Sequence, residues 1–128
     1  MFNPLNINQL NHVALHVADV DASVRFYRDV LGLQPIPRPA FDFPGAWLGL
    51  GNDQQLHLIG NRTLPVHSHN RGTHFALRVP DIHAAEAQLK ARNVAMRGPK
   101  RRPDGAWQIF IADPDGHFVE LCDLTQLQ

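Results

Sequence analysis

Polar and apolar residues alternate along two stretches of the chain, residues 10–17 and 73–79. The side chains of one alternate set are aliphatic or aromatic, and those of the other set are small or polar. A period of two is typical of a β-strand that buries one face. We therefore predict a strand in each stretch. The buried sets are Val13, Leu15, Val17 and Phe75, Leu77, Val79; the opposite sets are His12, Ala14, His16 and His74, Ala76, Arg78.

A helical spacing of apolar residues follows each of these strands. Residues 19–31 and 81–92 carry apolar side chains three or four positions apart, and Asp19 or Asp21 and then Asp81 can cap the two N-termini. Further strands are predicted at 46–50, 54–59, 106–112 and 117–123, with short ones at 33–39 and 94–97 and a basic loop at 98–105. Each half of the chain then has the order βαβββ.

The two halves also match residue by residue. His12 corresponds to His74 and Leu15 to Leu77, and near the ends of the halves Leu58 corresponds to Leu121. Internal repetition of this kind sets the architecture. We predict one domain in residues 1–128, with a module at about 9–62, a linker at about 60–72 and a second module at about 73–124.

Composition narrows the range of functions. The 12 basic and 12 acidic residues cancel, which argues against nucleic acid or an anionic membrane as the main partner. The lone cysteine, Cys122, fits a reducing compartment, and the chain has neither an apolar run of membrane-spanning length nor the pattern of a signal peptide. We therefore expect a cytoplasmic protein.

One possible metal ligand stands near each end of each half. Imidazole and carboxylate side chains bind Zn²⁺, Ni²⁺, Co²⁺, Mn²⁺ or Fe²⁺, and here each comes from a different predicted strand. Burying the aliphatic neighbours turns these polar side chains to the opposite face. If the first and last strands of each half pair, and the two sheets fold towards each other, the four ligands meet. They are His12, His57, His74 and Glu120.

In four segments the chain resembles the vicinal oxygen chelate superfamily. That superfamily groups glyoxalase I, methylmalonyl-CoA epimerase, fosfomycin-resistance thiol transferases, extradiol dioxygenases and bleomycin resistance proteins. The resemblance extends from Leu10 to Leu124 and implies an α+β fold, in which two βαβββ modules form a cupped, partly open, barrel-like mixed sheet with helices outside. The segments are Asn11-His12-Val13-Ala14-Leu15, residues 23–33, Thr73-His74-Phe75-Ala76-Leu77 and residues 113–121.

The resemblance also implies a ligand set and a reaction. The glyoxalase-like branch has its ligands at the positions of His12, His57, His74 and Glu120, and uses a divalent metal ion. The implied activity is that of a lyase or isomerase of glyoxalase I type, acting on a small substrate with vicinal oxygens through a metal-stabilised enediolate. Because glyoxalases carry a glutamate and epimerases a glutamine where this chain has His57, Glu120 is the one remaining carboxylate, both ligand and candidate base.

Four further residues are candidates for contact with the substrate. A thiol adduct is one candidate for that substrate. Asn61 matches an asparagine that helps glyoxalases to hold glutathione, whereas His16 stands where they usually carry an arginine for a glutathione carboxylate. Arg78 shares a strand face with His74. Arg101 belongs to a basic run, residues 97–102, that can clamp a carboxylate or phosphate.

Two alternatives remain open. His12, His74 and Glu120 alone would be a facial triad for Fe²⁺, as in extradiol dioxygenases and thiol transferases, with His57 as a neighbouring acid–base residue. A bleomycin-type drug-binding protein ranks last, because it needs no metal ligands. Since paired modules of this superfamily belong to one chain or are exchanged between two, we expect a homodimer.

Overall fold

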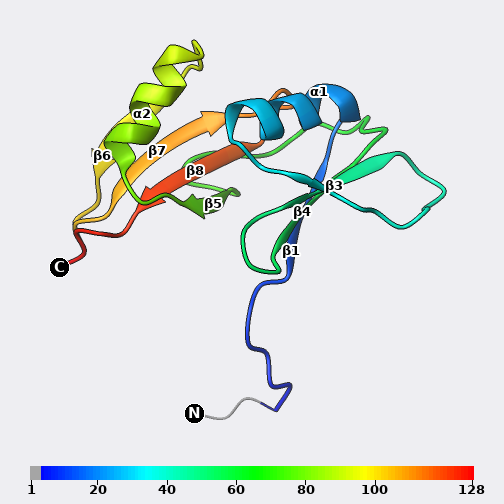
Figure 1. Ribbon diagram of the computed structural model, residues 1–128, viewed down its shortest axis with the longest axis horizontal. Helices are drawn as coiled ribbons and strands as arrows, with labels where there is room; N and C mark the ends of the chain where they lie inside the picture. Colours follow the sequence, from blue (N-terminus) through cyan, green and yellow to red (C-terminus); the bar gives the residue numbers. More distant parts are fainter. Residues whose placement is uncertain (1–3) are drawn as a thin grey trace.

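Two four-stranded mixed sheets form the framework of the computed structural model, which describes residues 4–128 (Figure 1). The first sheet has the order β1-β4-β3-β2, and the second has the equivalent order β5-β8-β7-β6. In each sheet the first strand pairs in parallel with the last, so the predicted repeat is present in the topology. The strands are β1 (His12–His16), β2 (Pro35–Ile36), β3 (Gly45–Gly49), β4 (Gln55–Ile59), β5 (Phe75–Arg78), β6 (Arg97–Arg101), β7 (Trp107–Ala112) and β8 (Phe118–Asp123).

A helix follows the first strand of each sheet, as the sequence predicts. Asp19 caps α1 (Val20–Arg25), where its side chain accepts from the backbone N–H of Ala22, and Asp81 caps α2 (Ile82–Ala91) in the same way. The first helix continues as η1 (Phe26–Val30), which has the wider π winding. Nothing in the apolar spacing of residues 19–31 signals that change. The α+β fold with helices outside two βαβββ sheets is confirmed, and the sheets do not close into a barrel.

The core lies between the helices and one face of each sheet. Of the alternate residues assigned to that face, Leu15 and Val17 are buried, whereas Val13, Phe75, Leu77 and Val79 are partly buried and pack against the core. Burying a single Leu or Val side chain is worth about 1.5–3 kcal/mol, so a one-residue slip of a strand would be costly. The side of each sheet that points away from the helices is called here its open face. The buried core residues include Leu15, Val17, Leu56, Leu58, Val119 and Leu121.

The turn between β7 and β8 joins the two modules. Tyr27 in η1 is fully buried and donates a hydrogen bond of 2.8 Å to Asp113 Oδ2, and burial beside this carboxylate raises the pKa of Tyr27. Asp115 accepts from the backbone N–H of Ala18 and forms an ion pair with Arg62, 2.8 Å apart. These contacts fix the orientation of one sheet relative to the other.

The basic segment at 98–105 is the main departure from the predicted elements. The sequence predicted a loop, but residues 97–101 form β6 and pair with β7. The strand is hard to recognise because it lies at the sheet edge and contains no apolar alternation, and its proline occupies a position that only edge strands tolerate. Gly98 has a φ of +100°, and a Cβ there would lie 2.6 Å from the carbonyl oxygen of Gln108. In residues 4–128 no helix is long and apolar enough to cross a membrane.

Candidate metal centre

The first candidate pair of ligands lies on the open face of the first sheet. The rings of His12 in β1 and His57 in β4 are stacked, with centroids 4.1 Å apart and planes inclined by 16°. Trp47, opposite His57 on β3, stacks on the other side of that ring at 4.0 Å and 2°. His57 is therefore the middle ring of a column of three.

The surroundings of His57 disfavour its protonated form. Burial lowers the pKa of His57 below its ordinary 6.5, and the nearby His12 and Arg38 lower it further. One ring nitrogen, Nε2, lies 2.8 Å from Oε1 of Gln55, which fixes the ring orientation. His57 is thus held neutral, the form that can bind a metal or accept a proton.

The stacking also limits how this pair can bind one ion. A metal lies in the plane of each imidazole that coordinates it. Two nearly parallel rings 4.1 Å apart cannot both point at the same ion, so one ring must turn if both are ligands. His12, whose Nδ1 lies 2.8 Å from the Asn11 side chain, is the outer ring of the column and has more room to turn than His57.

The second candidate pair lies on the open face of the second sheet. His74 Nε2 is 3.1 Å from Glu120 Oε1, and Gln108 donates a hydrogen bond of 3.2 Å to Glu120 Oε2. The Glu120 side chain is only 6% exposed and that of His74 24%. A carboxylate this buried requires compensation, which His74 and Gln108 supply.

The His74 ring shows that a cation suits this pair. Its Nδ1 lies 3.1 Å from the carbonyl oxygen of Gly72, while Nε2 faces the carboxylate. A neutral imidazole carries one N–H and can donate to only one of the two oxygens. When Nδ1 carries the proton and donates to Gly72, the Nε2 lone pair faces the Glu120 carboxylate, and one metal ion can bind both groups. The 3.1 Å separation is close to the ligand–ligand distance expected around an ion with bonds of about 2.1 Å.

The two pairs occupy equivalent places in the two sheets. His57 is paired with Ala14 across the parallel strands, and Glu120 is paired with Ala76 in the same manner. His12 and His74 also line one cavity of about 640 Å³ between β1 and β5, together with Arg78. Within residues 4–128, however, no three His, Cys, Asp or Glu side chains are grouped closely enough to hold a metal ion. A single chain thus assembles the four predicted ligands as two separate pairs.

The other predicted substrate-binding residues are spread over the molecule. Arg78 lies beside the His12–His74 cavity, but Asn61 has a positive φ of 63° and lines a different surface hollow near Asp19 and Arg38. His16 hydrogen-bonds the Gly60 carbonyl at 3.0 Å. Arg101 is paired with Trp107, whose ring contacts His83 of α2, so Arg101 lies on the helical side of the sheet, opposite Glu120.

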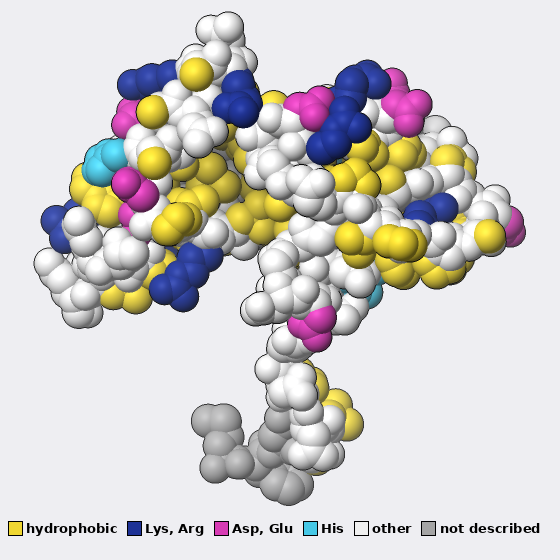
Figure 2. Space-filling view, viewed as in Figure 1, with side chains coloured by type: hydrophobic (Ala, Val, Ile, Leu, Met, Phe, Trp, Pro, Cys, Tyr) yellow, Lys and Arg dark blue, Asp and Glu magenta, His cyan; other side chains and the backbone are white. Residues whose placement is uncertain are grey.

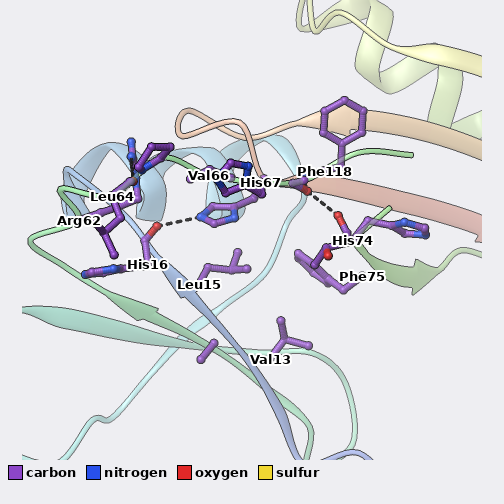
Figure 3. Close-up of a pocket in the computed structure, with 15 residues that line it drawn as sticks. Val13, Leu15, His16, Arg62, Leu64, Val66, His67, His74, Phe75 and Phe118 are labelled. Carbon is purple, nitrogen blue, oxygen red and sulfur yellow. Dashed lines mark hydrogen bonds between the residues drawn. The ribbon is translucent and has the colours of Figure 1, made fainter. Parts of the chain in front are cut away.

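A cavity of about 370 Å³ lies where the two modules meet (Figure 3). The labelled Val13 and Leu15 come from β1, whereas His74 and Phe75 come from the start of the second sheet. The backbone carbonyl oxygen of His16 lies 2.8 Å from His117 Nε2, so this contact links the two modules beside the cavity. The cavity is mainly apolar and adjoins the His74 side of the site.

Two residues beside the candidate ligands were missing from the predicted set. Gln108 holds Glu120, and Gln55 holds His57. The alternation of β7 places residue 108 on the open face, so that position was readable from the sequence. The hydrogen-bond partner of an amide side chain, however, cannot be identified from the sequence before the strand register is known.

The pH titration of His57 tests the ring column. Its NMR titration midpoint is expected below 6.5, and Trp47→Leu is expected to raise it because the ring becomes more hydrated. Since His57 has a lower pKa folded than unfolded, its contribution to stability is lost as the pH falls below 6.5. A wild-type midpoint at or above 6.5 would contradict this description.

Comparison with known proteins gives the family. A model of the "Glyoxalase/Bleomycin resistance protein/Dioxygenase superfamily" matches residues 9–121. The chain belongs to this superfamily. This confirms the resemblance stated from the four sequence segments, since the match includes all of them.

Individual members of the superfamily resemble the chain over most of its length. "Glyoxylase I 4" of Arabidopsis thaliana is 32% identical, over 98% of this chain and 76% of its own. "Lactoylglutathione lyase" of Haemophilus influenzae is 28% identical, over 90% and 92%. The crystal structure of lactoylglutathione lyase from Agrobacterium tumefaciens has the same fold, with a TM-score of 0.74, 24% identity, and coverage of 92% of this chain and 95% of its own. These relatives support an enzyme of the superfamily.

Proposed function

We propose that the chain is a metal-dependent lyase or isomerase of glyoxalase I type that acts on a small substrate with vicinal oxygens. His12, His57, His74 and Glu120 are the proposed ligands, and Glu120 is also the candidate base. The observation that supports the proposal is the His74–Glu120 pair, in which an imidazole nitrogen and a buried carboxylate oxygen face each other at 3.1 Å and can bind one metal ion together. The equivalent pair His12–His57 supports it.

The complete site is proposed to form between two copies of the chain. Within one chain the pairs stand on open faces that do not close over each other. A two-fold axis would place the open second sheet of the partner against the open first sheet, and a closed dimer of this kind has two equal sites. Each site would then combine His12 and His57 of one chain with His74 and Glu120 of the partner subunit. A homodimer in the cytoplasm follows as the expected form.

The side chains at the site have different roles in the proposed reaction. A bound divalent cation would act as a Lewis acid that stabilises negative charge developing on a substrate oxygen. Glu120 would take a proton from one substrate carbon at Oε1 and return it to the adjacent carbon, and the Gln108 hydrogen bond would hold Oε2 in place. His57, kept neutral by burial, offers a ring nitrogen and no positive charge.

One observation favours the facial-triad alternative as a second candidate. His57 is held between His12 and Trp47 and is bonded to Gln55, so it is the least free of the four to turn towards an ion. With His12, His74 and Glu120 as the ligands, Fe²⁺ would retain open positions, as in an extradiol dioxygenase or a thiol transferase. His57 would then serve as a neighbouring acid–base residue.

Metal analysis followed by one assay tests the leading function. Protein purified without chelator is expected to contain Ni²⁺, Zn²⁺ or a similar divalent ion, and to turn over the methylglyoxal–glutathione adduct. Protein stripped by chelator should lose that activity and regain it on addition of the metal. Iron with three protein ligands would favour the second candidate instead. Absence of turnover with Zn²⁺, Ni²⁺, Co²⁺, Mn²⁺ and Fe²⁺ would exclude the glyoxalase I reaction.

A further inference from the structure

Gln55 lies beside both histidines of the first sheet. It precedes His57 by two residues on β4, so the two side chains stand on the same face, and in the strand register it is the partner of His12 on β1. Its Oε1 lies 2.8 Å from His57 Nε2. Because an amide oxygen can only accept, the His57 ring proton is on Nε2 and is donated to Gln55.

Ring stacking and this hydrogen bond fix different features of the His57 ring. Contact with Trp47 on one side and with His12 on the other fixes the plane of the ring. A half-turn about the bond between Cβ and Cγ keeps the ring in that plane but exchanges the positions of Nδ1 and Cδ2. Stacking therefore does not decide which way the two nitrogens point, and the bond to Gln55 does.

The other ring nitrogen of His57, Nδ1, is left with a free lone pair. Within residues 4–128 the His57 ring is hydrogen-bonded only to Gln55, and no buried side-chain nitrogen or oxygen lacks a partner. Nδ1 is therefore accessible to solvent. With the proton on Nε2, Nδ1 is the atom of this neutral imidazole that can bind a cation.

His12 has the opposite arrangement. Its Nδ1 lies 2.8 Å from Asn11 Oδ1, which again can only accept, so the proton is on Nδ1 and the lone pair is on Nε2. Asn11 and His12 are both exposed, so the amide can follow the ring when it turns. A histidine that binds a metal usually donates its other ring N–H to an oxygen. Both rings meet this condition, through different nitrogens.

We propose that Gln55 is a positioning residue that presents Nδ1 of His57 to the metal ion, while Asn11 leaves Nε2 of His12 for the same ion. His57 then keeps its place in the ring column and its bond to Gln55, and His12 is the ring that turns. Assignment of Nδ1 to a metal rests on the proposed function, but the positions of the two ring protons do not. The two steps can therefore be measured one after the other.

The ring protons are measured first, on the full chain in chelator. Long-range ¹H–¹⁵N correlation NMR of protein labelled with ¹⁵N-histidine, recorded above the ordinary histidine pKa of about 6.5, distinguishes the two nitrogens of each neutral ring. We expect the proton on Nε2 in His57 and on Nδ1 in His12. Gln55→Leu should let His57 exchange between its tautomers, so that its two nitrogen shifts approach each other, and should leave the His12 tautomer unchanged. Asn11→Ala should do the reverse.

Titration with Zn²⁺ then tests the metal step. Nδ1 of His57 should acquire the shift of a coordinated nitrogen while Nε2 keeps its proton. Gln55→Leu should weaken zinc affinity about 10–100-fold, the loss typical of residues that orient a ligand, as measured by competition with a chromogenic chelator.

Gln88→Leu is the matched control. It removes an amide side chain from α2, which carries no candidate ligand and lies where basic and acidic side chains are interspersed around the helices (Figure 2). Both the ring spectra and the zinc affinity should stay as in wild type.

Three results would overturn the proposal. The first is a His57 ring protonated on Nδ1 in the metal-free chain, and the second is zinc that coordinates Nε2 of His57 or neither of its nitrogens. The third is equal loss of zinc affinity in Gln55→Leu and Gln88→Leu. If zinc binds through Nδ1 and the methylglyoxal–glutathione adduct is not turned over, the role of Gln55 stands and the proposed reaction falls.

Discussion

Two variants that are each inactive are expected to regain activity when they are unfolded, mixed and refolded together. The first is His12→Ala/His57→Ala, which removes the pair on the first sheet. The second is His74→Ala/Glu120→Ala, which removes the pair on the second sheet. Each homodimer would lack half of the ligands in both of its sites.

The mixed dimer would recover one complete site. One of its two sites combines the unchanged first sheet of the His74→Ala/Glu120→Ala chain with the unchanged second sheet of the His12→Ala/His57→Ala chain. The other site contains all four substitutions. With random pairing, half of the dimers are mixed, so the expected activity is about a quarter of that of wild type. The same recovery should appear in tightly bound metal per chain.

Mixing His12→Ala with His57→Ala is the matched control. Both substitutions lie on the first sheet, so every site in every combination lacks one ligand, and activity should stay at the level of the single variants. If mass spectrometry shows that the two double variants have formed mixed dimers and neither activity nor metal binding returns, a site shared between chains is excluded.

Strand periodicity was sufficient to predict the faces of the sheets. The alternation around His12, His74 and Glu120 put each of them on an open face, because any other register would expose Leu15 or Leu121. Matching positions in the repeat then predicted that His12 would meet His57 and that His74 would meet Glu120, and both contacts are present.

The relation between the two modules could not be predicted from periodicity. It depends on Tyr27 reaching Asp113 and on Asp115 accepting from Arg62, contacts between residues far apart in the sequence. The turn at 113–116 was recognisable, but its contact with η1 was not, since an aspartate in such a turn ordinarily bonds its own backbone. For this reason, the sequence predicted one group of four ligands where a single chain holds two pairs.

For a similar reason, the sequence did not show which residues of β6 face the helices. A run of arginines and lysines has no apolar alternation, so the faces of Lys100 and Arg101 appear only once the pairing with β7 is known. Arg101, predicted to bind substrate, lies with Trp107 on the helical side, whereas Lys100 lies on the open face. The two residues thus lie on opposite faces of β6, although both line one surface cavity of about 320 Å³.

Replacement of Glu120 by glutamine is expected to weaken metal binding strongly while the protein stays folded. Gln has the same shape, so the hydrogen-bonding distances to His74 and Gln108 can be kept, but the negative charge is lost. Loss of a direct carboxylate ligand should weaken metal affinity at least about a hundredfold, more than the 10–100-fold typical of residues that only support a ligand. Competition with a chromogenic chelator measures the affinity, and thermal unfolding checks the fold.

Glu86→Gln is the matched control, because Glu86 is a carboxylate on α2 that pairs with Lys90 and lies away from the open face. It should leave metal affinity unchanged. Gln108→Ala should fall between the two, since it removes the bond that holds Oε2 and leaves the charge.

The two roles proposed for Glu120 can be separated with the same variant. If Glu120→Gln binds metal within about threefold of wild type and loses only kcat, Glu120 is a base and not a ligand, and His74 must bind the ion without it. If metal affinity and kcat are both retained, neither role survives. Loss of both supports the ligand role, because a cation that suits the buried His74–Glu120 pair requires the charge that the substitution removes.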